Sequence, residues 1–294
     1  MHWLLALLLV FAPTVRIMSR AAVNTEQALR AYDRGSSEFA MRLATEAIDL
    51  DPSHAPAHAA LAHIHAGEGR HAQAVAAYQA GLAVLGKDHA LNPTLRYDLA
   101  VVLLAHRDLD GVPFTKRTAL KDKAIAALDE VLARNAKHHE ARHRRGRAHD
   151  WLDHANAAEA DYRECIQLKP SYVPCFVSLA ALYVDYGFSA QGLAVLEAGQ
   201  AHNGKDAAMW TGTGRVYSQL DRPRDAIAAY EKARTIDPGL VQVLFGLGMA
   251  HAELRQRKQA VENLQAFLRR APPDVSKLQL RTAADTLARM HDVI

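Results

Sequence analysis

The chain has 294 residues and a formal net charge of +3, and half of its residues are hydrophobic. Only 6% are aromatic and alanine recurs throughout, a composition that favours closely packed helices over sheets rich in β-branched and aromatic residues. The weak positive charge argues against a nucleic-acid-binding protein, and two cysteines are too few for a disulfide framework.

The first predicted element is an apolar run over residues 3–12 (WLLALLLVFA), too short to span a bilayer but of the length of a signal-peptide core. Residues 19–21 (SRA) supply a small-x-small cleavage site. No Lys or Arg precedes the run, so a buried first helix or a misassigned start is the alternative. We expect residues 1–20 to lie outside the main fold. An exported or membrane-associated protein is favoured over a cytoplasmic one, with membrane contact through this segment only.

From residue 21 onward, small residues and prolines recur in registers whose usual step is 34 residues, with longer steps around the third repeat. One register comprises Ala40 and Ala74, and then Ala124, Ala158, Gly192, Ala226 and Ala260. A second comprises Ala28, Ala62, Ala100, Gly146, Ala180, Gly214 and Gly248. A third comprises Pro52, Pro170, Pro238 and Pro272, with Gly86, Ala136 and Gly204 in the same phase. Since the apolar spacing between these marks is helical, each unit is predicted to be a helix–turn–helix whose small residues let the two helices approach.

These registers make the sequence resemble the tetratricopeptide repeat family. The clearest repeat has Trp210, Gly214, Tyr217, Ala226, Tyr230 and Pro238, with Thr213 in place of leucine. The next has Leu244, Leu247, Gly248, Ala260, Leu264 and Pro272. The resemblance implies an all-α fold in which helix–turn–helix repeats stack as a right-handed α-solenoid. We count seven repeats: 21–54, 55–88, 93–138, 139–172, 173–206, 207–240 and 241–274.

Two segments depart from the repeat. Residues 106–118 (HRDLDGVPFTKRT) are inserted between the two helices of the third repeat, and the sequence Asp110-Gly111 with Pro113 predicts a loop. A tolerated surface insertion and a projecting binding loop both remain open. Residues 275–294 predict one more amphipathic helix that caps the last repeat. Its apolar side consists of Leu278, Leu280, Ala284, Leu287 and Met290.

Residues 139–143 (HEARH) fit the H-E-x-x-H zinc-peptidase pattern, with His149 and His154 among the candidates for a third ligand. The motif falls at the start of a repeat, however, and Arg142 lies inside it, where positive charge opposes a zinc ion. A zinc-dependent peptidase is therefore the alternative function. We expect a protein that is not an enzyme and has no metal site and no cofactor.

Arg142 and Arg145 stand where the family pattern wants an aromatic residue and a leucine. An isolated buried charge is costly, so these arginines must be paired or reach water. The candidate partners are Glu159, Asp161 and Glu164 on the following helix, or Asp129 and Glu130 before it. Cys165 and Cys175 are interpreted as small buried apolar residues, with a single bridge as the alternative in an exported protein.

The resemblance implies that first helices line a concave groove in which peptides or partner helices bind. The positions implied to face it are Thr25, Leu29, His63, Tyr97, Val101, His143, Arg147, Val177, Thr211, Arg215, Phe245 and Met249. We expect binding by Tyr97, His143, Arg147, Trp151, Arg215, Phe245 and Met249. The lysines and asparagines of a chaperone-tail clamp are absent. The sequence thus predicts a protein–protein interaction scaffold whose partner is a peptide or protein segment with acidic residues.

Overall fold

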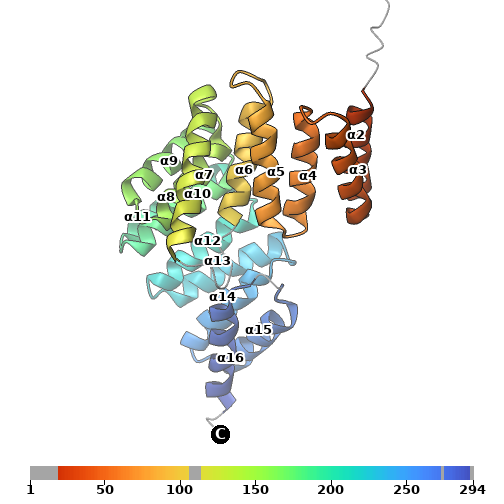
Figure 1. Ribbon diagram of the computed structural model, residues 1–294. Coiled ribbons are helices and arrows are strands. Elements are labelled where there is room, and N and C mark those ends of the chain that lie inside the picture. The colour runs from red at the N-terminus through yellow and green to blue at the C-terminus, as the bar shows by residue number, and fades with distance from the viewer. Residues whose placement is uncertain (1–18, 106–113, 273–274, 292–294) are drawn as a thin grey trace, which may run out of the picture. The chain divides into compact units, whose positions relative to one another are not determined.

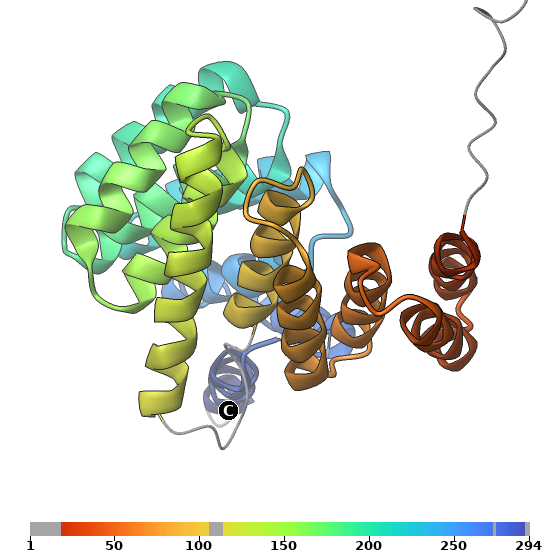
Figure 2. The same cartoon turned by 45° about the horizontal axis from the view of Figure 1, so that its top comes forward.

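A computed structural model describes residues 19–105, 114–272 and 275–291. Over these ranges the chain forms fifteen α-helices and no strand, which confirms the predicted all-α class. Figures 1 and 2 show the helices side by side in antiparallel pairs, and the described residues divide into two compact bodies between Arg134 and Asn135. The apolar run at residues 3–12 and the insertion over residues 106–113 lie outside the described residues. No described helix is long and apolar enough to cross a membrane.

The N-terminal body contains the first three repeats. Each repeat is one helix pair, and consecutive pairs pack on each other. The helices are α2 (Arg20–Asp33), α3 (Ser37–Leu50), α4 (Ala55–Gly67), α5 (His71–Val84), α6 (Asn92–Ala105) and α7 (Phe114–Arg134).

The C-terminal body contains the remaining four repeats and one further helix. Its pairs are α8 (His139–Trp151) with α9 (Ala155–Leu168), α10 (Val173–Asp185) with α11 (Ser189–Asn203), α12 (Ala207–Gln219) with α13 (Pro223–Ile236), and α14 (Val241–Glu253) with α15 (Arg257–Arg270). The last helix, α16 (Lys277–His291), packs against α14 and α15.

Small residues set the separation of the paired helices, as the sequence predicted. A Cβ atom added at Gly146 of α8 would lie 2.7 Å from the ring of Tyr162 on α9, and one at Gly214 of α12 would lie 2.7 Å from the ring of Tyr230 on α13. Real Cβ atoms do not approach so closely, so each glycine makes room for the tyrosine of its own repeat. The first helix and second helix therefore interlock at the same point in both repeats.

One helix boundary and one apolar side chain differ from the sequence-based expectation. Helix α7 begins at Phe114, so residues 114–118 of the predicted loop are helical. The segment after Pro113 is rich in Lys, Arg, Ala and Leu, which are strong helix formers, and the buried Lys121 donates to the Leu104 carbonyl of α6 at 3.0 Å. In α16, Leu280 and Leu287 pack on the core, whereas Leu278 is 72% exposed.

Candidate partner-binding face of the C-terminal body

The first helices of the C-terminal body are neighbours in space. Helix α10 packs against both α8 and α12, and α12 packs against α14. The fifth and ninth residues of each repeat lie on one side of the row because they are one helical turn apart. This row is the surface on which the sequence places most of the candidate binding residues.

Arg147 on α8 and Arg215 on α12 occupy the same position in their repeats, 68 residues apart, and both are exposed. Neither guanidinium forms an ion pair or hydrogen bond with any residue that the structure describes. Between them, α10 presents Val177 and Ala181, which are half-buried apolar residues. The row therefore offers two available cations separated by an apolar stretch.

His143, one turn before Arg147, lies in a different environment from the one expected for a groove residue. It is only 8% exposed, its Nε2 is 3.0 Å from the Ser178 hydroxyl, and its ring contacts the ring of Tyr172 edge-on at 5.7 Å. Burial, followed by the charges of Arg147 and Arg144, lowers the pKa of His143 to about 3. The imidazole is therefore neutral at physiological pH and joins two repeats.

The other candidate binding residues are partly covered. Trp151, the last residue of α8, is half-buried. Phe245 and Met249 on α14 pack in the core cluster to which α16 contributes, and Phe245 lies 5.2 Å from the ring of Phe267. Tyr97 lies half-buried on α6 in the N-terminal body. Part of the surface of Phe245 and Met249 is therefore used by the chain itself.

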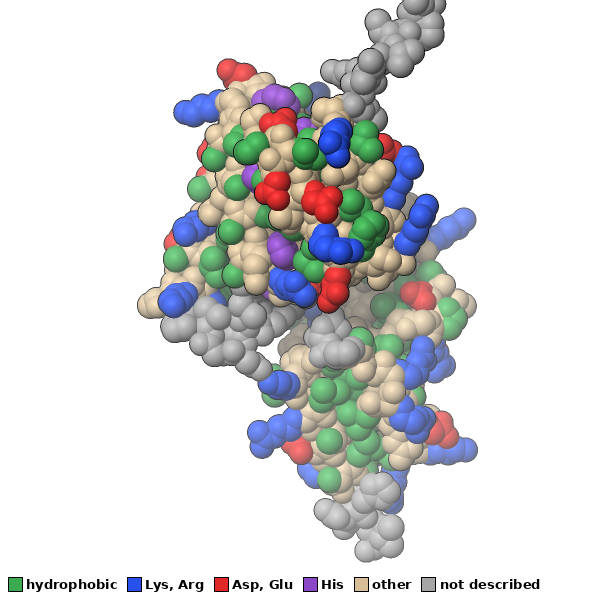
Figure 3. Space-filling model, turned by 45° about the vertical axis from the view of Figure 1, so that its right-hand side comes forward, with side chains coloured by type: hydrophobic (Ala, Val, Ile, Leu, Met, Phe, Trp, Pro, Cys, Tyr) green, Lys and Arg blue, Asp and Glu red, His purple; other side chains and the backbone are tan. Residues whose placement is uncertain are grey.

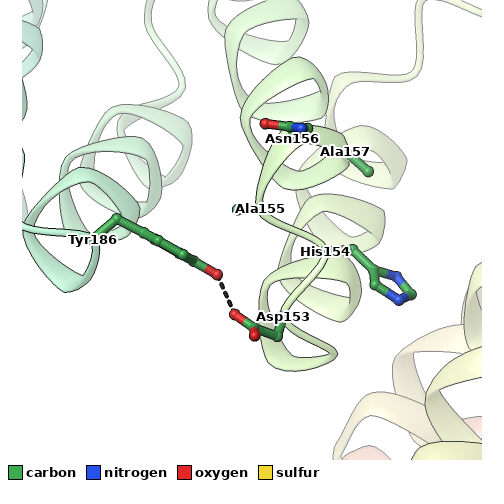
Figure 4. A pocket seen from close by; sticks show the side chains of 6 residues that line it. All are labelled: Asp153, His154, Ala155, Asn156, Ala157 and Tyr186. Atoms are coloured by element: carbon green, nitrogen blue, oxygen red, sulfur yellow. Dashed lines mark hydrogen bonds between the residues drawn. The ribbon is translucent and has the colours of Figure 1, made fainter.

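Sequence reasoning missed a group of carboxylates near the ends of α8 and α10. Burial, then the charge of Asp185, raises the pKa of Asp150, while Arg147 acts in the opposite direction. Tyr186 donates a hydrogen bond to Asp153, and both line a pocket of about 400 Å³ (Figure 4). The signal in the sequence was Asp150 in the last turn of α8 and Asp185 at the end of α10. The face drawn in Figure 3 carries acidic and basic side chains interspersed rather than in separate patches of one charge.

Arg142 and Arg145 are paired, as the sequence required. Both oxygens of the Asp161 carboxylate accept from Arg145, at 2.9 and 2.6 Å, and Arg142 pairs with Glu164 at 2.7 Å. The side chain of Asp161 is only 4% exposed. Two of the three candidate partners on the following helix are therefore confirmed, whereas the third, Glu159, pairs with Arg163. The interior of the fourth repeat is thus ionic.

The HEARH residues do not converge on a common point with other metal-ligating side chains. His139 lies against the ring of Tyr172 at 4.9 Å, and His143 uses its Nε2 toward Ser178. Over residues 19–105, 114–272 and 275–291, no group of three or more His, Cys, Asp or Glu side chains is arranged to hold a metal ion.

Cys165 on α9 and Cys175 on α10 are both fully buried, as expected, but they form a disulfide rather than two free thiols. The turn between the two helices brings their Cα atoms to 6.2 Å, within the range that a disulfide bridges. Sequence spacing alone does not specify this separation, because it depends on how the fifth repeat packs on the fourth.

Three comparisons place the chain among known proteins. Tetratricopeptide repeat family models match residues 139–172, 178–241 and 242–273, all of which lie in the C-terminal body. Peroxisome biogenesis protein 5 of Arabidopsis thaliana is 30% identical over 86 residues, which is 29% of this chain and 12% of that protein. The match therefore covers only a small part of that relative.

Solved structures agree with the fold. A tetratricopeptide repeat protein of Parabacteroides merdae superposes with a TM-score of 0.70 at 16% identity, covering 92% of this chain and 99% of that one. A thermophilic tetratricopeptide repeat protein of Thermus thermophilus gives 0.54 at 20% identity, covering 67% and 99%. PilF of Pseudomonas aeruginosa gives 0.55 at 17% identity, covering 76% and 95%. The C-terminal body thus carries tetratricopeptide repeats, and the described chain has the all-helical solenoid fold of tetratricopeptide repeat proteins.

Proposed function

We propose that the C-terminal body binds a protein segment carrying acidic residues along the row of first helices, with Arg147 and Arg215 as its anchors. Tetratricopeptide repeats are typically non-catalytic scaffolds for protein–protein contact, and this chain shares their fold. The observation that carries the finer proposal is the pair of exposed arginines in equivalent positions, without ion pairs or hydrogen bonds to described residues.

Arginine suits this role because its planar guanidinium makes two charge-assisted hydrogen bonds with one carboxylate. Adjacent first helices pack about 10 Å apart, so the two arginines are on the order of 20 Å from each other, a span for about six extended residues. Val177 and Ala181 would contact apolar side chains between the two carboxylates. Asp150 lies beside Arg147 and would repel an acidic residue placed one turn further along, which restricts the register of the segment.

The test begins with a random-peptide display library selected on the immobilised full chain at low salt. Selected peptides should be enriched in Asp and Glu, and their affinity should fall as salt is raised. In calorimetry, Arg147→Ala and Arg215→Ala should each weaken a selected peptide by about 10- to 100-fold without changing the melting temperature.

Arg224→Ala is the matched control. Arg224 is an exposed arginine of the same repeat as Arg215 but lies on the second helix, α13, and forms no ion pair with described residues. Its substitution should leave peptide affinity unchanged. Equal loss in all three variants would indicate non-specific attraction, and unchanged affinity in the Arg147→Ala/Arg215→Ala double variant would refute the proposed site.

A further inference from the structure

The turns between the two helices of a repeat each contain an equivalent backbone hydrogen bond. In each of the six repeats whose inner turn the structure describes, the N–H of the residue just before the second helix donates to a carbonyl five residues earlier, near the end of the first helix. The donor–acceptor pairs are Ser36–Ala31, Arg70–His65, His154–His149, Phe188–Tyr183, Arg222–Tyr217 and Gln256–His251. This is the 6→1 bond of a Schellman motif, and it holds the two residues of each pair next to each other.

The side chains of such pairs meet. In the sixth repeat the Arg222 guanidinium lies 4.6 Å above the Tyr217 ring, and in the seventh the Nδ1 of His251 lies 2.5 Å from the amide oxygen of Gln256. In the fourth repeat both members are histidines. The Nδ1 atoms of His149 and His154 are 3.3 Å apart.

That separation has a chemical meaning. Two imidazole nitrogens bound to one tetrahedral metal ion at 2.0–2.1 Å are about 3.3 Å apart, whereas a hydrogen bond between the two rings would be long at this distance. His154 is exposed at the start of α9, and its ring points away from Asp153 and Tyr186 (Figure 4).

We propose that His149 and His154 bind one divalent ion of the kind that imidazole prefers, such as Zn²⁺, Ni²⁺ or Cu²⁺, through their Nδ1 atoms. No third ligand joins them within the described parts of the chain, so water completes the coordination and the ion exchanges readily. The ion links the end of α8 to the start of α9. The site is new relative to the sequence-based expectation of no metal, and it excludes the HEARH residues, since His143 is committed to Ser178.

Reciprocal substitutions between two repeats test the proposal on the full chain. His154→Gln copies the His251–Gln256 pair of the seventh repeat, so the turn should fold normally while the second metal ligand is lost. Gln256→His installs the histidine pair in the seventh repeat. Metal-free protein is titrated calorimetrically with Zn²⁺, Ni²⁺ and Cu²⁺, and with Mg²⁺ as a hard cation that imidazole does not favour.

The parent chain should bind one equivalent, most tightly for Cu²⁺, with no heat for Mg²⁺, and saturating Ni²⁺ should raise its melting temperature. His154→Gln should lose the equivalent and the thermal shift, Gln256→His should gain a second equivalent, and His139→Ala should behave as the parent. Retention of the equivalent in His154→Gln, or its loss in His139→Ala, would overturn the proposal. Absence of a second equivalent in Gln256→His would overturn the argument that the turn alone positions the pair.

Discussion

The fourth and sixth repeats, residues 139–172 and 207–240, have the same fold and opposite interiors. Both pack a glycine of the first helix against a tyrosine of the second, Gly146 on Tyr162 and Gly214 on Tyr230. Around that contact the fourth repeat is ionic and the sixth is mainly apolar. The comparison shows which features of the repeat are geometric requirements and which are interchangeable chemistry.

Arg142 and Trp210 occupy equivalent positions and form equivalent hydrogen bonds. Two nitrogens of Arg142 donate to the Ala136 carbonyl at 3.1 and 3.0 Å, and the indole Nε1 of Trp210 donates to the Gly204 carbonyl at 2.7 Å. Each carbonyl lies six residues before its donor. The position therefore needs a long, flat donor that reaches back to the turn between repeats, and a guanidinium meets that need as an indole does.

The neighbours of this position change with it. In the fourth repeat Glu164 pairs with Arg142 at 2.7 Å, and in the sixth the equivalent Lys232 lies 4.1 Å above the ring of Trp210. An anion thus accompanies the cation, and a cation accompanies the π-face. Each combination is electrostatically matched within its own repeat.

The largest effect should come from replacing Asp161, whose equivalent in the sixth repeat is the non-polar Ala229. Asp161→Ala leaves Arg145 without its bidentate partner in a site where the carboxylate was 4% exposed. We expect the free energy of unfolding, measured by urea denaturation, to fall by about 3–5 kcal/mol.

The control rebuilds the sixth repeat inside the fourth. Arg142→Trp, Arg145→Thr and Asp161→Ala together remove the charges as well as their partner, so most of the lost stability should return. A triple variant as unstable as Asp161→Ala alone would show that the two repeats differ in shape as well as in chemistry.

A second difference lies at the junctions. Cys165 and Cys175 form a disulfide between the fourth and fifth repeats, whereas the equivalent residues Ala233 and Val243 are joined only by packing. Cys165→Ala with Cys175→Val should therefore lower the free energy of unfolding by about 2.7 kcal/mol. This is the free-energy equivalent of the loop-closure entropy for a loop of roughly ten residues. Reduction of the parent with dithiothreitol should reproduce the loss and should not affect the variant further. Unchanged stability of the parent chain in dithiothreitol would contradict the disulfide.

The sequence predicted the helix pairs, which follow from the repeat, and the ion pairs of the buried arginines, which follow from the cost of burying an unpaired charge. The 34-residue registers identified the helix pairs, and burial of Arg142 and Arg145 required acids that the following helix supplies. It could not predict what depends on docking between repeats. By its place in the repeat, His143 should face the row of first helices, yet Tyr172 at the end of its own repeat and Ser178 of the next repeat cover it. The disulfide has the same origin, since only the docked geometry brings Cys165 to Cys175.

The burial of His143 should appear in the pH dependence of stability. Its pKa in the folded chain is about 3, against about 6.5 when unfolded, so below pH 6.5 the unfolded state binds a proton that the folded state refuses. As the pH is lowered below 6.5, this group should reduce the free energy of unfolding by up to about 1.4 kcal/mol per pH unit, or about 2 kcal/mol between pH 6.5 and 5.

His143→Thr, which copies Thr211 of the sixth repeat, should be less stable overall but flatter between pH 6.5 and 5. Urea denaturation at several pH values measures the slope. The raised pKa of Asp150 acts in the opposite direction in both proteins, so it cancels from the difference. Parallel slopes for the parent and His143→Thr would show that the imidazole is accessible to protons in the folded state.

The smallest effect should come from exchanging the neighbours of the donor position. Glu164 is about half exposed, so its pair with Arg142 contributes less than the buried one, and Glu164→Lys should cost about 1 kcal/mol by replacing attraction with repulsion. In an Arg142→Trp background the same Glu164→Lys change should be neutral or favourable, because the lysine then lies over an indole as Lys232 does. The coupling energy of this double-mutant cycle, obtained from denaturation of the four proteins, should be about 1–2 kcal/mol. Additive effects would mean that the pairings of Arg142 with Glu164 and of Trp210 with Lys232 are coincidental. Coupling of this sign would establish that the charge of the neighbouring side chain is matched to the residue that donates to the carbonyl between repeats.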